Sequence, residues 1–358
     1  MNHLQRYGVT GYFESQASQY PDLTLGRVVA QYRKLYRVVT AAGEQLAEIS
    51  GKLRYETSEF AQLPTVGDCV MVNGAGGQDN AVIHQVLARR SVFLRKAAGT
   101  SGQAQTVAAN IDLVFICMSL NNDFNLSRLE RYLSIAWDSG AKPVILLTKA
   151  DLCADLSGAV AEVERVSAYS DVVALSIYDQ DINQKLQPFL HQGVTAAFIG
   201  SSGVGKSTLI NTLLGEERIL TSETRDDDKG RHTTTGREMF PCPMGGVLID
   251  TPGMRELGVE TANLAKSFAD IDELAGQCRF GDCTHTSEPG CRVLEALHSG
   301  QLDQRRLDSY FKLKHEAGYE GLGSREIENK KLERMFKDVG GIKGARKYIK
   351  ETLKNKKA

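Results

Sequence analysis

A glycine-rich run in the second half of the chain has the residue types and spacing of a nucleotide phosphate loop. It follows a predicted strand, Ala196–Ile199, and begins a predicted helix, Ser207–Leu214, as the full pattern requires. Its Lys is expected to reach the outer phosphates, and its Ser to bind Mg²⁺. The alternative is a glycine-rich turn without a ligand. The expected nucleotide contacts are Gly200, Ser201, Ser202, Gly203, Val204, Gly205, Lys206, Ser207 and Thr208.

A second phosphate-site motif, Asp-Thr-Pro-Gly, occupies 250–253 and ends the strand-like segment Gly246–Asp250. Asp250 is a candidate catalytic residue that holds the hydration shell of magnesium, and the Gly253 amide is a candidate donor to the γ-phosphate. Alone, this motif would be weak. Its position downstream of the phosphate loop gives it weight.

Between these motifs, the sequence Gly-Arg-His-Thr-Thr-Thr at 230–235 supplies hydroxyl groups for a mobile switch. We predict Thr234 as the switch threonine, acting in catalysis and as a magnesium ligand. Thr233 and Thr235 are close rivals. An ordinary polar loop would be preferred if the flanking motifs were absent.

A base-reading motif, Thr-Lys-Ala-Asp, closes the apolar segment Pro143–Leu147. Its Asp could accept hydrogen bonds from guanine N1 and the exocyclic amine, which selects guanine against adenine. The alternative is a strand that ends in a solvated Lys and Asp. This motif normally follows the phosphate loop and here precedes it, so the order predicts a circularly permuted GTPase. The candidate base contacts are Thr148, Lys149, Ala150, Asp151 and Ser176.

Three cysteines and one histidine lie within fourteen residues near the C-terminal end, with spacings that suit one tetrahedral ion. A closed set of four ligands predicts a structural zinc site rather than a catalytic one, because a catalytic zinc keeps one position for water. The alternatives are a disulfide pair or scattered buried cysteines. The candidate zinc ligands are Cys278, Cys283, His285 and Cys291.

The chain resembles the RsgA (YjeQ) family of circularly permuted GTPases. The resemblance rests on the permuted motif order, the segment 230–235, the Asp-Thr-Pro-Gly motif with its Met-Arg extension at 250–255, and the cysteine cluster. The resemblance covers nearly the whole chain. It implies GTP and GDP as ligands, Mg²⁺ and one Zn²⁺ as cofactors, and the small ribosomal subunit and its rRNA as partners. One departure is Thr148, where the family usually has asparagine; a threonine can still contribute one hydroxyl group, so guanine selectivity is expected.

Met254 occupies the place where Ras-like GTPases have a water-orienting glutamine, a feature shared with the family. The nearest polar candidate for this role is His232, which could exchange hydrogen bonds with water near neutral pH. The alternative is that His232 contacts rRNA or solvent.

The composition of the chain is that of a soluble globular protein, with 358 residues, 42% hydrophobic and 24% charged. We find no signal-peptide pattern and no apolar stretch of membrane-spanning length, so we expect a cytoplasmic monomer with reduced thiols. The net charge of −1 conceals a basic tail, residues 330–358, with eleven Lys or Arg against three Asp or Glu. This tail is either a solvated helical surface or a contact to phosphate backbone.

We predict three parts: an OB-fold-like β-barrel with its linker at 1–105, a circularly permuted α/β P-loop GTPase domain at 106–262, and a zinc-binding helical domain with the basic tail at 263–358. The pattern of short β-branched runs fits an SH3-like barrel nearly as well. Two basic pairs in 88–96 indicate a nucleic-acid face or merely a barrel rim, and the small polar residues 97–105 predict a linker. Because the segment after Asp250 runs into the cysteine cluster, nucleotide state could move the C-terminal part.

The function that the resemblance implies is GTP hydrolysis coupled to binding and late maturation of the small ribosomal subunit. One alternative is a nucleotide-dependent RNA-binding assembly factor with negligible hydrolysis. Another is a permuted P-loop ATPase, which rests only on the departure at Thr148.

Overall fold

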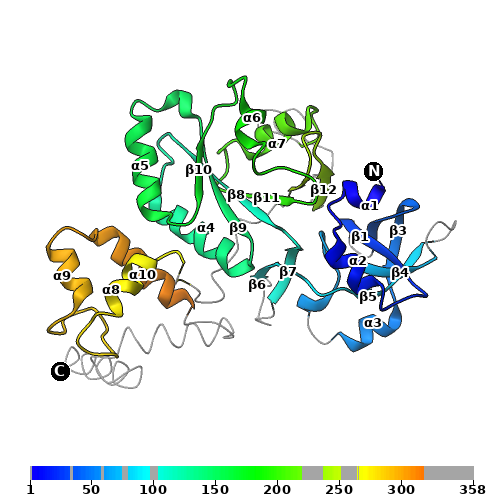
Figure 1. Cartoon of the computed structure of the whole chain (residues 1–358), viewed down its shortest axis with the longest axis horizontal. Coiled ribbons are helices and arrows are strands. Elements are labelled where there is room, and N and C mark those ends of the chain that lie inside the picture. Colours follow the sequence, from blue (N-terminus) through cyan, green and yellow to red (C-terminus); the bar gives the residue numbers. More distant parts are fainter. Residues whose placement is uncertain are drawn as a thin grey trace, which may run out of the picture.

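The computed structural model describes residues 2–32, 35–57, 60–74, 80–96, 104–219, 237–250, 264 and 266–317. Within these ranges the chain forms a barrel, an α/β sheet and a C-terminal helical region (Figure 1). The helical region contains a cluster of three cysteines and one histidine. The predicted switch residues His232, Thr234 and Gly253, and the basic tail, lie outside the described residues. Among the helices in these ranges, none is long and apolar enough to cross a membrane.

The N-terminal part is a closed barrel of five strands, which confirms the predicted barrel and gives it the strand number of an OB-fold. The strands pair in the order β1-β2-β3-β5-β4, and β4 also pairs with β1. Short helices surround it. The elements are α1 (His3–Arg6), α2 (Gly11–Ala17), β1 (Thr24–Gln31), β2 (Tyr36–Thr40), β3 (Gly43–Ile49), α3 (Gly51–Glu56), the 3₁₀ turn η1 (Phe60–Gln62), β4 (Cys69–Asn73) and β5 (Ala81–Val86).

The interior of the barrel is filled by alanine and β-branched side chains together with Tyr36. Val28 and Val38 face each other across β1 and β2, and Val70, Val72 and Ile83 complete the same fully buried cluster. Because side chains fill this space, a ligand of the barrel must bind on its outer surface.

A hairpin of β6 (Val92–Lys96) and β7 (Ala104–Ala109) follows the barrel. The predicted linker over 97–105 is therefore wrong at its end, because Ala104 and Gln105 are paired residues of β7. The hairpin packs closely on the barrel at Gly67. Its φ is +92°, and a Cβ there would lie 2.0 Å from the Ala109 carbonyl oxygen, so only glycine fits.

The central sheet has the strand order β10-β9-β8-β11-β13-β12, with every strand parallel to its neighbours except β12. This confirms the predicted parallel α/β domain. An apolar core lies on each face of this sheet, and α4 packs into the core on one face while α7 packs into the core on the other. The elements are β8 (Leu113–Ser119), α4 (Leu126–Ser139), β9 (Lys142–Thr148), the 3₁₀ turn η2 (Ala150–Leu152), α5 (Leu156–Val166), β10 (Asp171–Ala174), α6 (Ile182–Leu186), β11 (Thr195–Ile199), α7 (Lys206–Leu214), β12 (Glu238–Pro241) and β13 (Val247–Asp250).

The barrel and the central sheet are continuous, because β12 pairs with β1 through Glu238 and Ala30 to give one eleven-stranded sheet. Arg27 strengthens this junction. Its guanidinium is 1% exposed and donates to the carbonyl oxygens of Tyr7 at 2.7 Å and Asn110 at 3.2 Å, and to Thr195 Oγ1 at 2.9 Å. A charge this deeply buried is kept in place by those acceptors.

The C-terminal region consists of α8 (Ala269–Ala275), α9 (Arg292–His298) and α10 (Gln304–Ala317). It packs against α4 and shares one apolar cluster with the sheet, in which Phe268, Val293 and Leu307 join Leu129 and Leu133 of α4. We refer to residues 266–317 as the cysteine-cluster module. Its attachment to α4 places it next to the loops at the carboxyl edge of the sheet.

Candidate nucleotide and metal sites

The predicted phosphate loop connects β11 to α7, as the sequence indicated. Gly200, Gly203 and Gly205 have φ of +150°, +72° and +97°, which other residues rarely adopt. A Cβ on Gly200 would also lie 2.5 Å from the Cys117 carbonyl oxygen. Lys206 folds over the loop, with Nζ 2.8 Å from the Gly200 carbonyl oxygen. The loop therefore has the backbone geometry that lets amide groups face a phosphate.

A residue that the sequence did not single out, Asp123, contacts this loop. Its carboxylate accepts a hydrogen bond from Ser201 Oγ at 2.5 Å and is paired with Arg128 Nη1 at 2.7 Å. The hydrogen bonds from Arg128 and Ser201 lower the pKa of Asp123, so the group is charged at neutral pH. Asp123 lies between β8 and α4, and it fixes the loop against the start of that helix.

The base-reading loop begins at the end of β9, beside the phosphate loop. Thr148 is 3% exposed and its Oγ1 donates to the Val204 carbonyl oxygen at 2.7 Å, so its hydroxyl ties the two loops together. Lys149 has a left-handed φ of +58°, which turns the chain so that Asp151 is exposed. The Ala150 amide donates to the Leu175 carbonyl oxygen at 3.2 Å.

Ser176, the second predicted base contact, begins the loop after β10 and is 3% exposed. Its amide donates to Asp179 Oδ2 at 2.9 Å, and its Oγ accepts from the Tyr178 amide at 3.3 Å. The hydrogen bond between Ala150 and Leu175 holds this loop beside the one that carries Asp151. The structure thus brings the two predicted base-contacting loops together.

Asp250 ends β13, which is parallel to β11 with Ile249 opposite Ala197. The carboxyl ends of parallel strands meet at one edge of the sheet, so Asp250 lies at the edge from which the phosphate loop emerges. Its carboxylate and the Ser207 hydroxyl are the hard oxygen donors that suit Mg²⁺. The donor chemistry therefore fits the predicted magnesium site.

The four predicted zinc ligands converge, with their ligand atoms all within 4.8 Å of one another. His285 Nδ1 lies 3.6 Å from Cys278 Sγ and 3.5 Å from Cys291 Sγ, and these two sulfur atoms are 3.9 Å apart. Tetrahedral ligands at zinc–sulfur distances of about 2.3 Å would have sulfur atoms roughly 3.8 Å apart. Burial lowers the pKa of His285, which favours the neutral imidazole that a metal requires.

The disulfide alternative is wrong, because all three cysteines are free thiols in the structure, as are the other four. Cys291 also caps α9 by accepting from the Leu294 amide at 3.4 Å. The cluster is therefore built into the packing of the module rather than placed on its surface.

One of the two basic pairs after the barrel has a structural role. Arg89 Nη2 lies 2.8 Å from Asp68, which is fully buried, and the guanidinium also donates to the carbonyl oxygens of Ala61 and Leu63. Arg90 is paired with Asp112 at 3.2 Å and is about half exposed. Arg89 thus belongs to the barrel rim, which favours that alternative over a nucleic-acid face.

Comparisons with known proteins agree with this arrangement. A sequence model of the RsgA GTPase family matches residues 86–260. The chain is 48% identical over 350 residues to small ribosomal subunit biogenesis GTPase RsgA 2 of Lactiplantibacillus plantarum, covering 98% of each chain. It is 44% identical over 319 residues to RsgA 1 of Listeria innocua, which bears the same description, covering 88% of this chain and 90% of the relative.

Two solved structures have a similar fold. YjeQ from Thermotoga maritima has a TM-score of 0.62 and 25% identity, covering 82% of this chain and 98% of that one. YloQ, described as a circularly permuted GTPase, has a TM-score of 0.59 and 25% identity, covering 84% and 96%.

Proposed function

We propose that this chain, which belongs to the RsgA family of circularly permuted GTPases, hydrolyses GTP to drive a late step in maturation of the small ribosomal subunit. The curated relatives are described as small ribosomal subunit biogenesis GTPases. In our proposal the chain binds the subunit in its GTP form and leaves after hydrolysis.

The observation that carries this proposal is that three residues from motifs that the permutation reorders lie at one edge of the sheet. Asp151 is in the turn after β9, Lys206 begins α7 after the loop that follows β11, and Asp250 ends β13, and these strands run parallel in one sheet. A base-reading carboxylate, a phosphate loop and a magnesium carboxylate at one edge form the site that guanine nucleotide hydrolysis needs.

The residues of this edge have distinct roles in the proposal. The loop amides bind the phosphates and Lys206 reaches the outer ones, while Asp151 selects guanine. Ser207 would bind Mg²⁺ and Asp250 would hold its hydration shell, and the ion would neutralise the developing negative charge on the transferred phosphoryl group. Lys206→Ala should suppress hydrolysis, and Asp151→Asn should weaken GTP binding and reduce discrimination against other purines.

The switch supplies the rest of the catalytic set in our proposal. Thr234 binds magnesium, the Gly253 amide contacts the γ-phosphate, and His232 positions the attacking water once the subunit is bound. His232→Ala should then bind GTP and the subunit normally and lose most of the subunit-stimulated rate. Retained stimulation would assign the water to another group.

We further propose that Cys278, Cys283, His285 and Cys291 hold one structural Zn²⁺, which their geometry fits. The partner surface would be rRNA of the small subunit, with the basic tail contacting phosphate groups without reading sequence. We expect a monomer in the cytoplasm, divided into domains at 1–105, 106–262 and 263–358.

The deciding experiment measures phosphate release from GTP with and without purified small subunits, with Lys206→Ala as the matched control. We expect a slow intrinsic rate that rises strongly when subunits are added. Nucleotide-dependent co-sedimentation without any stimulated release would instead favour an RNA-binding assembly factor with negligible hydrolysis.

A further inference from the structure

Four residues on four adjacent strands form a row that leads from the barrel to the predicted magnesium carboxylate. Arg37 of β2 is opposite Ala30 of β1, Ala30 is opposite Glu238 of β12, and Glu238 is opposite Asp250 of β13. Residues directly opposite in antiparallel strands project to the same face. The four side chains therefore share one face of the continuous sheet.

The Arg37 guanidinium reaches across Ala30 and forms an ion pair with the Glu238 carboxylate. Neighbouring strands are about 4.8 Å apart, so the two long side chains can span the intervening strand only because Ala30 between them is small. Ala30 is 2% exposed. A barrel residue thus neutralises a carboxylate of the GTPase domain.

The position of Glu238 makes this neutralisation important. Like charges directly opposite each other on paired strands repel, and Glu238 faces Asp250 in that way. Without a cation, the Glu238 carboxylate would be a second negative oxygen donor beside the magnesium site, where it could compete for the ion or its water molecules. Arg37 engages that donor.

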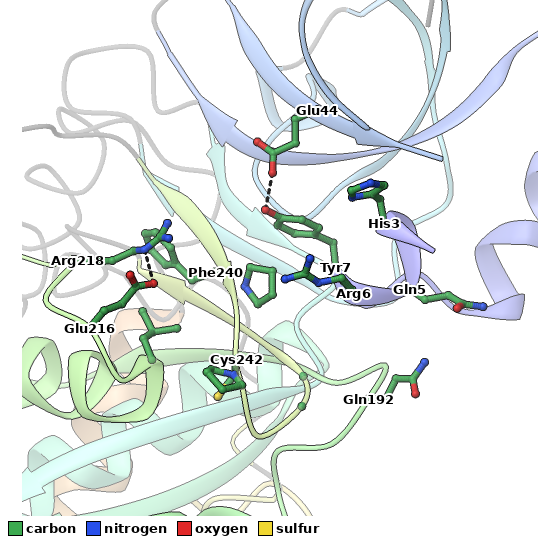
Figure 2. A pocket seen from close by; sticks show the side chains of 15 residues that line it. His3, Gln5, Arg6, Tyr7, Glu44, Gln192, Glu216, Arg218, Phe240 and Cys242 are labelled. Carbon is green, nitrogen blue, oxygen red and sulfur yellow. Dashed lines mark hydrogen bonds and ion pairs between the residues drawn. The ribbon is translucent and has the colours of Figure 1, made fainter. Parts of the chain in front are cut away.

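The surroundings of Arg37 suit an adjustable contact. Its Nε lies 3.5 Å from Glu44, which accepts a hydrogen bond from Tyr7 Oη at 2.7 Å, and both Arg37 and Glu44 are partly exposed. Tyr7 and Glu44 also line a cavity of about 850 Å³ between α1, the barrel and the hairpin of β12 and β13 (Figure 2). The side chains of Arg37 and Glu238 are 27% and 31% exposed, so water has access to the ion pair that joins the barrel to the central sheet.

We propose that Arg37 is a positioning residue for GTP hydrolysis, which binds the Glu238 carboxylate and so keeps it away from the magnesium site at Asp250. The position of the barrel relative to the central sheet therefore sets the geometry of the metal site. This inference rests on the proposed GTPase function. It gives the barrel a direct role in hydrolysis, because whatever displaces β2 from β12 changes the charge next to Asp250.

The test compares Arg37→Ala, Glu238→Gln and the double variant, with Arg90→Ala as control. Arg90 pairs with Asp112, away from Asp250, and is likewise partly exposed. We measure kcat for GTP with and without small subunits, and the magnesium concentration that supports half-maximal binding of a fluorescent GDP analogue.

We expect Arg37→Ala to lower kcat and to raise that magnesium concentration, each by roughly tenfold, the size typical of changes in the groups that surround metal ligands, because the freed Glu238 carboxylate would draw the ion away from the nucleotide. Glu238→Gln and the double variant should stay within about threefold of the parent, because neither leaves an unpaired carboxylate opposite Asp250.

If the ion pair only held the barrel against the central sheet, the pattern would differ. Glu238→Gln and the double variant would then change kcat and the magnesium dependence as much as Arg37→Ala does. That pattern, or an unchanged magnesium dependence in Arg37→Ala, would overturn the proposal. The binding measurement does not require turnover, so absence of hydrolysis in the parent chain would count against the proposed function and leave the inference about Arg37 testable.

Discussion

The central α/β domain has two neighbours, and one ionic contact with each of them shows a contrast in burial. At the cysteine-cluster module, Glu130 of α4 is fully buried and accepts from Arg306 at 2.9 Å and Arg305 at 3.1 Å, while Arg306 is also bound to both oxygens of Asp270. At the barrel, Arg37, Glu238 and Glu44 are all partly exposed, and Glu44 lines a cavity.

This difference indicates what each contact can do. A buried ionic network is costly to open, because each charge it releases stays in a medium that solvates it poorly. A water-accessible pair exchanges its partner for water at little cost. We infer that the cysteine-cluster module moves with α4 as one body, and that the barrel contact near β12 is the one that can change during the functional cycle.

The largest expected effect is loss of the proposed zinc ion from the cysteine-cluster module. Cys283→Ser, or a chelator, should remove on the order of several kcal/mol of stability, because metal binding contributes to folding of a region with a small core. The fluorescence of Trp137 in α4, the only tryptophan in the chain, should report this unfolding. Lys266 Nζ of the module lies 4.5 Å from the centre of its ring, so the indole senses whether the module is folded.

Cys153→Ser is the matched control, because Cys153 is partly buried and lies outside the cluster. Metal analysis should find one zinc in the parent and in this control, and less in Cys283→Ser. An unaltered Trp137 thermal transition in Cys283→Ser would mean that the module is held by its apolar contacts alone.

A smaller effect is expected from opening the buried network itself. Glu130→Ala should lower the free energy of unfolding by about 3 kcal/mol, because it leaves Arg306 largely buried with one partner fewer. The control on the same helix is Arg131→Ala, whose pair with Glu316 is partly exposed and should contribute less than about 1 kcal/mol. Denaturant unfolding followed by Trp137 fluorescence compares them. Equal losses would mean that burial does not determine how much these ionic contacts contribute to stability.

The sequence predicts those features of the site that depend on local pattern. The phosphate loop, the strands that end at Thr148 and Asp250, and the cysteine cluster each follow from spacing within one segment, and the structure places them as expected. The roles of Asp123 and Glu238 could not be predicted in this way. Each depends on a partner, Ser201 or Arg37, that is distant in sequence and adjacent only after folding.

Charge alone was also a poor guide to function in the N-terminal region. Arg89 has the sequence context of a nucleic-acid contact, yet its partner Asp68 is a buried carboxylate of the barrel. The predicted linker over 97–105 extends too far for a different reason, because Ala104 and Gln105 pair with Lys96 and Arg95 of the neighbouring strand β6. The small polar side chains of this segment did not indicate that pairing.

The smallest expected effect on stability belongs to the Arg37 pair, and this gives the sharpest comparison. Both side chains are roughly 30% exposed, so Arg37→Ala should lower the free energy of unfolding by less than about 1 kcal/mol. Arg37→Ala should nevertheless change the magnesium dependence of nucleotide binding more than Glu130→Ala does. The reason is that it releases the Glu238 carboxylate, which faces Asp250. Glu130→Ala should show the reverse, a large loss of stability and an unchanged magnesium dependence. Thermal unfolding and magnesium titration of these two variants under the same buffer conditions make the comparison. If both variants lost stability and magnesium affinity in the same proportion, the contact between Arg37 and Glu238 would serve only to hold the barrel in place, as the Glu130 network holds the cysteine-cluster module.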